Sequence, residues 1–168
     1  MCIRDRIHNF PLLLIFRCGI GTKTKCELTI LVYQLIYTAA LTERATRQDL
    51  LDIAQKSAIK NVEHGITGIL LTKEGSVLQV LEGDQTKVEA LYAKIKNDPR
   101  IGNQIVLIRR EGEKREFPQW SMGFRHADDS QISGVFNLSQ NSLPVALPQN
   151  ASDEVQTFTQ TFARVNGL

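Results

Sequence analysis

The sequence predicts one α+β domain with the element order β-α-β-β-α-β-β, because its apolar residues alternate between strand spacing and helix spacing along the chain. The most informative run is 77–81, which is apolar at four positions and carries Gln79 in its middle. Such a run is typical of a strand buried on both faces. A buried amide without partners costs about 1–3 kcal/mol, so we expect a polar side chain or a ligand against Gln79.

Runs rich in β-branched and aromatic residues predict the strands. They are 29–37, 66–71, 77–81, 105–108 and a strand around 120–124. The turn at 73–75 closes a hairpin between the second and third of these. With helices covering one face of the sheet, the order corresponds to a ferredoxin-like fold.

Capping signals predict the two helices between the strands. Thr46 begins a capping box, and apolar residues at helical spacing carry the first helix to about Asn61. Thr86 and Glu89 form a second capping box, and Pro99 stops the second helix.

The two ends of the chain differ in composition from its middle. Residues 1–28 have no helical or strand period, so we expect a disordered or artefactual extension before a domain at 29–126. Residues 127–168 are expected to form a helical cap, with its helix at 152–165 on the uncovered face of the sheet. The apolar face of that helix comprises Val155, Phe158, Phe162 and Val165.

Charge and cysteine content exclude several functions. Residues 1–29 hold five basic and two acidic residues, so the basic pI of 8.5 belongs to the extension and not to a nucleic-acid-binding face. All three cysteines also precede residue 27, which excludes a disulfide framework, a cysteine zinc site and thiol chemistry in the domain. The three histidines are far apart, and no metal site is expected. No apolar run is long enough to span a membrane, and we expect a cytoplasmic protein.

Three polar residues are expected to converge beneath the two helices. Strands 29–37 and 77–81 form the usual central pair of this topology, so Tyr37 and Gln79 can face each other, and Asn61 ends the first helix nearby. A phenol and two amides around an apolar slot would suit a flat heteroaromatic ring with carbonyl and imide edges. Plain structural roles remain open: Asn61 as a helix cap, Gln79 bonded to backbone, and Tyr37 as ordinary core.

The chain resembles the BLUF domain, a blue-light sensor that uses FAD, over roughly residues 30–125. The segments that carry the resemblance are Ile36-Tyr37, Asn61 with Gly65-Ile66-Thr67-Gly68, Leu78-Gln79-Val80-Leu81-Glu82-Gly83 and Trp120-Ser121-Met122. The strand with Gln79 and the strand with Trp120 are specific in combination, whereas each alone is weak.

The resemblance implies a binding site for FAD between the two helices. Asn61 and Gln79 would hydrogen-bond the ring edge, and Gln79 would bridge Tyr37 and the flavin. Further residues are implied around the cofactor and along the signal path: Ile53, Ile66 and Val77 along the ring, Lys94 and Asp98 near the ribityl and phosphate groups, and Trp120 and Met122 as the signal relay. For Lys94 the alternative is a solvated helix face.

The implied function is light sensing without catalysis, through rearrangement of the Tyr37–Gln79–flavin hydrogen bonds. Too few residues follow 125 for an output enzyme, so we expect a downstream protein bound in trans; a homo-oligomer stays open. Two alternative functions require residues that the chain lacks at the corresponding positions. An acylphosphatase-type enzyme needs an arginine and a glycine in the loop after the first strand, and residues 38–42 have neither. An RNA-binding module needs aromatic residues on the strand at 77–82, which has none.

Overall fold

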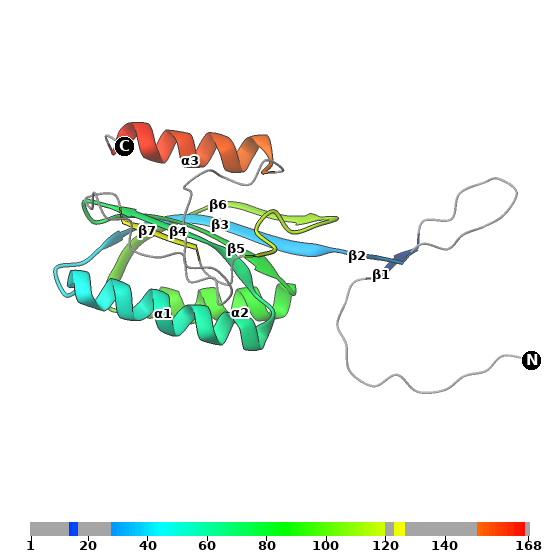
Figure 1. Ribbon diagram of the computed structural model, residues 1–168, viewed down its shortest axis with the longest axis horizontal. Coiled ribbons are helices and arrows are strands. Elements are labelled where there is room, and N and C mark those ends of the chain that lie inside the picture. The colour runs from blue at the N-terminus through cyan, green and yellow to red at the C-terminus, as the bar shows by residue number, and fades with distance from the viewer. Residues whose placement is uncertain (1–13, 17–27, 120–122, 127–150, 167–168) are drawn as a thin grey trace, which may run out of the picture.

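The computed structural model describes residues 14–16, 28–119, 123–126 and 151–166. A five-stranded sheet in the order β6-β3-β5-β4-β7 has α1 and α2 on one face and α3 on the other (Figure 1). The predicted ferredoxin-like α+β architecture is therefore confirmed. The strands of this sheet are β3 (Val32–Leu41), β4 (Thr67–Lys73), β5 (Ser76–Gly83), β6 (Ile101–Gly112) and β7 (Gly123–His126).

The centre of the sheet is the antiparallel pair β3 and β5, as the sequence predicts. Every residue of β5 after Ser76 is buried, because helices cover both of its faces. β6 is an edge strand of 12 residues, much longer than the predicted 105–108. Its inner and outer residues alternate in exposure, so polar positions interrupt the apolar signal.

Helix α1 (Arg47–His64) begins with the predicted capping box. The Thr46 side chain accepts from the Asp49 amide, and the Asp49 carboxylate accepts from the Thr46 amide at 2.9 Å. The helix continues three residues beyond the predicted Asn61 and ends at Gly65, whose φ of 65° is the left-handed conformation that favours glycine.

Helix α2 (Gln85–Lys96) starts earlier than predicted. Asp84 is its N-cap and accepts from the Lys87 amide at 3.1 Å, so the capping box expected at Thr86 is wrong. Both Asp84 and Thr86 are suitable cap residues, but β5 ends at Gly83, which leaves Asp84 at the turn into the helix.

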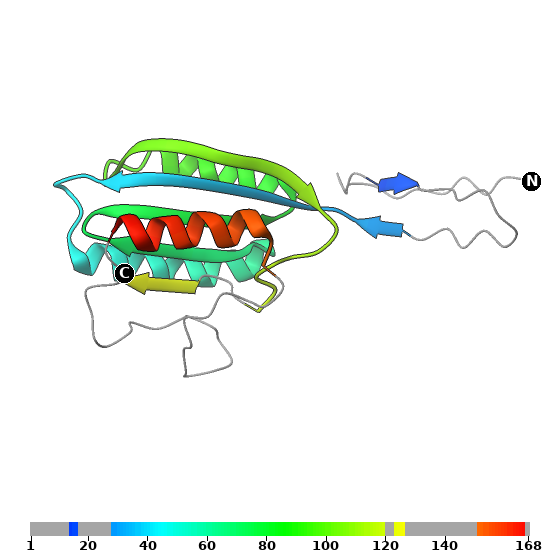
Figure 2. The ribbon, with the colours of Figure 1, turned by 90° about the horizontal axis from the view of Figure 1, so that it is seen from above.

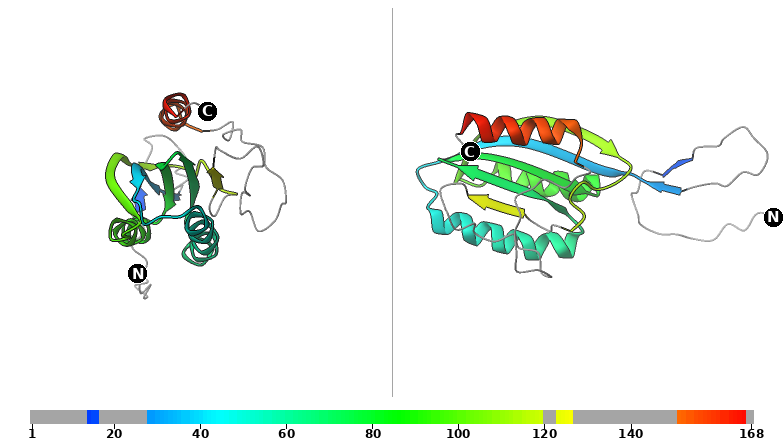
Figure 3. Two further views of the ribbon diagram at one scale, coloured as in Figure 1. Left: turned by 90° about the vertical axis from the view of Figure 1, so that its left-hand side faces the viewer. Right: turned by 45° about the horizontal axis from the view of Figure 1, so that its top comes forward.

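Helix α3 (Asp153–Val165) has Ser152 as its N-cap and covers the second face of the sheet (Figure 3). Val155 and Phe162 are buried as predicted, and Phe158 is partly buried. Val165 is 74% exposed, so its assignment to the apolar face is wrong. Thr159 is buried instead, because it lies on the same helix face as Val155 and Phe162, and its hydroxyl donates to the Val155 carbonyl.

Two apolar clusters hold the layers together. The first joins the sheet to α1 and α2; it includes Leu35, Tyr37, Ala54, Ile66, Val77, Leu81, Val88 and Tyr92. The second joins the sheet to α3; it includes Ile36, Leu78, Val80, Phe117, Val155 and Phe162.

A separate two-stranded sheet precedes the domain. β1 (Leu14–Phe16) pairs antiparallel with β2 (Leu28–Ile30), beyond one end of the main sheet (Figure 2). The sequence predicts no regular structure before residue 29, because strands of three residues are too short to show a period. The division into 1–28, 29–126 and 127–168 stays a prediction.

Candidate functional site

Tyr37 and Gln79 form a buried pair at the middle of the sheet. They are direct partners in the register between β3 and β5, and the Tyr37 hydroxyl donates to Oε1 of Gln79. Tyr37 has no exposed surface and Gln79 is 5% exposed. The polar partner that the sequence required for Gln79 is therefore Tyr37.

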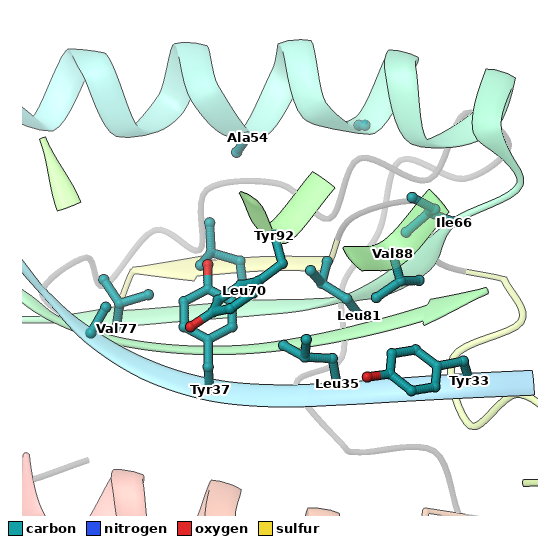
Figure 4. Close-up of a cluster of buried hydrophobic side chains, with 12 residues drawn as sticks. Tyr33, Leu35, Tyr37, Ala54, Ile66, Leu70, Val77, Leu81, Val88 and Tyr92 are labelled. Atoms are coloured by element: carbon teal, nitrogen blue, oxygen red, sulfur yellow. The ribbon is translucent and has the colours of Figure 1, made fainter. Parts of the chain in front are cut away.

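Burial determines the protonation state of Tyr37. Desolvation raises the pKa of its hydroxyl well above the ordinary value for tyrosine, and the neighbouring Tyr92 raises this pKa further. The two rings lie 5.1 Å apart at an angle of 54° (Figure 4). Tyr37 is thus a neutral hydrogen-bond donor over the whole physiological pH range.

Asn61 occupies the last turn of α1 and is 2% exposed. Its backbone carbonyl accepts from the Ile66 amide at 2.8 Å, which fixes the turn into β4. Gly65, not Asn61, is the helix cap, so the capping role that the sequence left open is wrong. Asn61 also lines the cleft described next.

A cleft of about 460 Å³ lies between α1 and α2. Ile53 of α1 and Leu91 and Ile95 of α2 supply apolar surface, and the remaining lining is mostly charged. A cleft of this volume between helices is typical of a site for a small ligand or cofactor.

The charged residues of the cleft are mainly basic. Its lining contains five cations and three aspartates: Lys56, Lys60, Lys87, Lys94 and Arg100, with Asp49, Asp52 and Asp98. Arg100 binds Asp98 in a bidentate ion pair, with Nε–Oδ1 at 2.8 Å and Nη2–Oδ2 at 2.6 Å. The hydrogen bonds from Arg100 lower the pKa of Asp98, so this carboxylate is ionised. An anionic group would find its partners among the lysines.

The structure places the predicted site residues in two layers. Ile53, Asn61, Lys94 and Asp98 line the cleft, and Lys94 is exposed. Ile66 and Val77, each 1% exposed, lie with Tyr37 in the apolar cluster between the helices and the sheet. Trp120 and Met122 lie outside the described residues.

Two groups of polar residues lie outside the set predicted from the sequence. Lys56 and Lys60 line the cleft from α1, and their spacing of four residues on a helix was a signal available in the sequence. Glu82 ends the apolar run of β5 and is 1% exposed. A carboxylate directly after buried strand residues could have indicated a buried polar network, because isolated buried charges are rare.

Within the part of the chain that the structure describes, no group of three or more histidine, cysteine or acidic residues is arranged to hold a metal ion. In the same part of the chain, no helix has the length and apolarity needed to cross a bilayer.

Residues 32–123 match the family model of BLUF, described as sensors of blue-light using FAD. This match covers more than half of the chain and includes Tyr37, Asn61 and Gln79. It gives no support to an acylphosphatase-type enzyme or an RNA-binding module.

Known proteins with related sequences and structures carry light-sensor names. Photoactivated adenylate cyclase subunit alpha of Euglena gracilis is 33% identical over 129 residues, which cover 71% of this chain but only 13% of that protein. The dark-state structure of BlrB, a BLUF protein, is 28% identical with a TM-score of 0.55, covering 56% of this chain and 72% of that one. Klebsiella pneumoniae BlrP1 with FMN and cyclic diGMP is 32% identical with a TM-score of 0.54, covering 56% of this chain and 26% of that one.

Proposed function

Because the chain belongs to the BLUF family of flavin-binding blue-light sensors, we propose that it binds FAD non-covalently and signals through the Tyr37–Gln79 pair. The observation that carries this proposal is the buried hydrogen bond from Tyr37 to Gln79 beneath the helices that wall the cleft. The domain is a sensor, and we assign the chain no catalytic role of its own.

The cleft fits a flavin nucleotide in size and chemistry. Its volume of about 460 Å³ and the apolar surface of Ile53, Leu91 and Ile95 suit a flat ring, and Asn61 offers an amide to the ring edge. Lys94 and the other cations suit the phosphates of FAD, although the BlrP1 structure was solved with FMN. When bound, the flavin absorbs blue light and becomes an electron acceptor.

Tyr37 and Gln79 supply the switch. The Tyr37 hydroxyl keeps its proton in the dark because burial raises its pKa, and it donates that proton in a hydrogen bond to Oε1 of Gln79. An amide has a donor end and an acceptor end. Rotation of the Gln79 side chain, or its tautomerisation, exchanges these ends and thereby changes which group Gln79 offers to the flavin and to Tyr37.

The output is proposed to be a downstream protein in trans. The relatives include cyclase subunits much longer than the matched region, and BlrP1 was solved with cyclic diGMP. These activities belong to those proteins, and nothing in the described residues assigns one of them to this chain.

Absorption spectroscopy of the purified full chain tests the proposal. We expect a yellow protein whose flavin spectrum shifts reversibly to the red under blue light, and whose released cofactor elutes with an FAD standard rather than FMN. A colourless protein that also fails to bind added flavin would contradict the proposal.

Gln79→Leu tests the assigned switch. Leucine keeps the approximate volume but has no amide to exchange, so the variant should retain flavin and lose the red shift completely. A reversible shift like that of the parent would show that Gln79 is not the switch. Lys96→Ala, on the exposed side of α2, is the matched control and should keep the shift.

A further inference from the structure

A polar network joins β5 to the start of α3 on the face of the sheet opposite the cleft. We name it the α3 anchor; its members are Gln34, Glu82, Arg110, Glu116 and Ser152. Three of them, Gln34, Glu82 and Glu116, are buried. The network lies outside the cleft and has no part in the proposed flavin site.

Glu82 is the end of the anchor on β5, three residues after Gln79. Its carboxylate accepts from Nε2 of Gln34 at 2.9 Å and from Oγ1 of Thr67 at 3.3 Å. It also accepts from the backbone amides of Glu116 and Phe117, each at 3.0 Å. The chain at 116–117 is therefore held by β5 itself, and a displacement of β5 is passed to this segment.

Glu116 passes the connection on to α3. Its carboxylate accepts from Nη2 of Arg110 at 2.6 Å, and from the Ser152 amide at 2.8 Å. Arg110 in turn donates to Oε1 of Gln34 at 2.8 Å and to Oγ of Ser152 at 2.7 Å. The Arg110 guanidinium thus binds three groups at the same time: Ser152, the N-cap of α3; Gln34 on the neighbouring strand; and Glu116.

The polar contacts of α3 with the sheet side are concentrated at one end. Among the described residues, they involve Ser152 and Glu154 in its first turn; the rest of the helix contacts the sheet through apolar groups. Directional bonds fix a position, whereas apolar packing tolerates sliding. A cleft of about 430 Å³ borders the anchor, so water can replace a bond that lengthens.

From this arrangement we infer that Glu82, Glu116 and Arg110 are positioning residues for signal output, coupling β5 to the first turn of α3. This inference rests on the proposed light switch at Gln79. A rearrangement of Gln79 displaces β5, Glu82 moves with its strand, and the bonds from Glu116 to Ser152 loosen. The first turn of α3 then opens more often. The last turns of the helix move only because they are joined to the first.

Hydrogen exchange of the full chain, in darkness and under blue light, tests the inference with Arg110→Gln. In darkness the variant should exchange the amides of residues 152–158 about tenfold faster than the parent, because the anchor bonds to the N-cap are lost. Arg110→Lys keeps the positive charge but not the planar guanidinium with its several donors. It should give a smaller increase in the exchange rate. Arg109→Gln is the matched control: Arg109 lies over Tyr92 and pairs with Glu89, so residues 152–158 should exchange as in the parent.

Illumination separates a positioning role from a merely structural one. The parent should exchange 152–158 faster in light, and Arg110→Gln should retain the red shift of the flavin but lose this light-dependent difference. Parent-like dark exchange in Arg110→Gln, or a full light-dependent difference, would overturn the inference. Should Arg110→Gln fail to fold, Arg110→Lys gives the same test with fewer bonds removed and leaves the N-cap Ser152 intact. A parent without a red shift would refute the proposed function, and the dark comparison would still test the anchor.

Discussion

The two faces of the sheet bury polar groups in opposite ways. On the face covered by α1 and α2, a hydrogen bond between two neutral side chains joins Tyr37 to Gln79, and Tyr37 belongs to the apolar cluster. On the face covered by α3, the carboxylates of Glu82 and Glu116 accept seven hydrogen bonds between them. A hydrogen bond between two neutral side chains can rearrange at modest cost, whereas a network of bonds to carboxylates holds its members in one arrangement until the strand that carries it moves. The sheet thus separates a switchable site from a rigid one.

The largest effect is expected on the rigid face, from Glu82→Gln. The amide can accept at one end only, so at least one of the backbone amides of Glu116 and Phe117 would face an NH₂ group in a buried site. The free energy of unfolding should fall by about 3 kcal/mol. Urea denaturation followed by circular dichroism measures it, with the exposed Glu111→Gln as control. A loss under about 1 kcal/mol would remove the contrast between the faces.

A smaller effect is expected from the pair on the other face. Tyr37→Phe and Gln79→Leu should each lower the free energy of unfolding by about 1–2 kcal/mol, because each leaves a buried partner without its bond. The double variant should cost no more than either single one, which corresponds to a coupling of about 1–2 kcal/mol. A double-mutant cycle by urea denaturation measures this coupling, with the parent and the three variants compared at the same flavin occupancy. Additive losses would show that the two side chains are stabilised independently.

The cleft on the switchable face extends the comparison to exposed groups, since the lysines that line it are exposed. Lys94→Ala should raise the dissociation constant for FAD about threefold to fivefold at low salt, as expected for one exposed charge pair. The effect should shrink as salt screens it, and riboflavin, which has no phosphate, should bind unchanged. Titration by flavin fluorescence gives these constants. The matched control is Lys96→Ala, which does not line the cleft; equal weakening by both variants would exclude a specific role for Lys94.

The smallest effect is a pH dependence at the edge of the switchable face. Burial, and after it the hydrogen bond to Glu89, raises the pKa of Tyr33 to about 12. A tyrosine in the unfolded chain titrates near pH 10, so the contribution of Tyr33 is fully present below about pH 10. It is lost as the pH rises towards about 12, because only the unfolded chain releases the proton in that interval.

Tyr33→Phe should therefore make the alkaline fall of stability shallower than in the parent. Tyr37 and Tyr92 still contribute to that fall, because burial raises the pKa of both. Unfolding curves at several pH values between about 8 and 12 compare the two proteins. An identical slope in both would show that Tyr33 keeps an ordinary pKa in the folded state.

The sequence predicted the fold and the central pair because both depend on strand patterns. Buried β5 has a nearly continuous apolar run, and the usual pairing of this topology places Gln79 beside Tyr37. The length of β6 was not predictable, because an exposed edge strand tolerates polar residues at every second position. The N-cap of α2 depended on where β5 ends, which is a tertiary property and not a local one.

The candidate site was only partly predictable, for the same reason. Ile53, Asn61, Lys94 and Asp98 do line one cleft, yet the sequence does not reveal that Arg100 holds Asp98. The α3 anchor was not predictable at all: Gln34 and Ser152 are far apart along the chain. Such contacts follow from the packing of whole elements, which local patterns do not contain.

The placement of the cleft and of α3 on opposite faces also bears on how the protein is assembled. A molecule that enters between α1 and α2 meets those helices and the turn after α2, and does not have to displace α3 (Figure 3). Loading of the cleft and capping of the far face can therefore occur in either order. A chain that folds while flavin is scarce can complete its outer layer first and still accept its chromophore later.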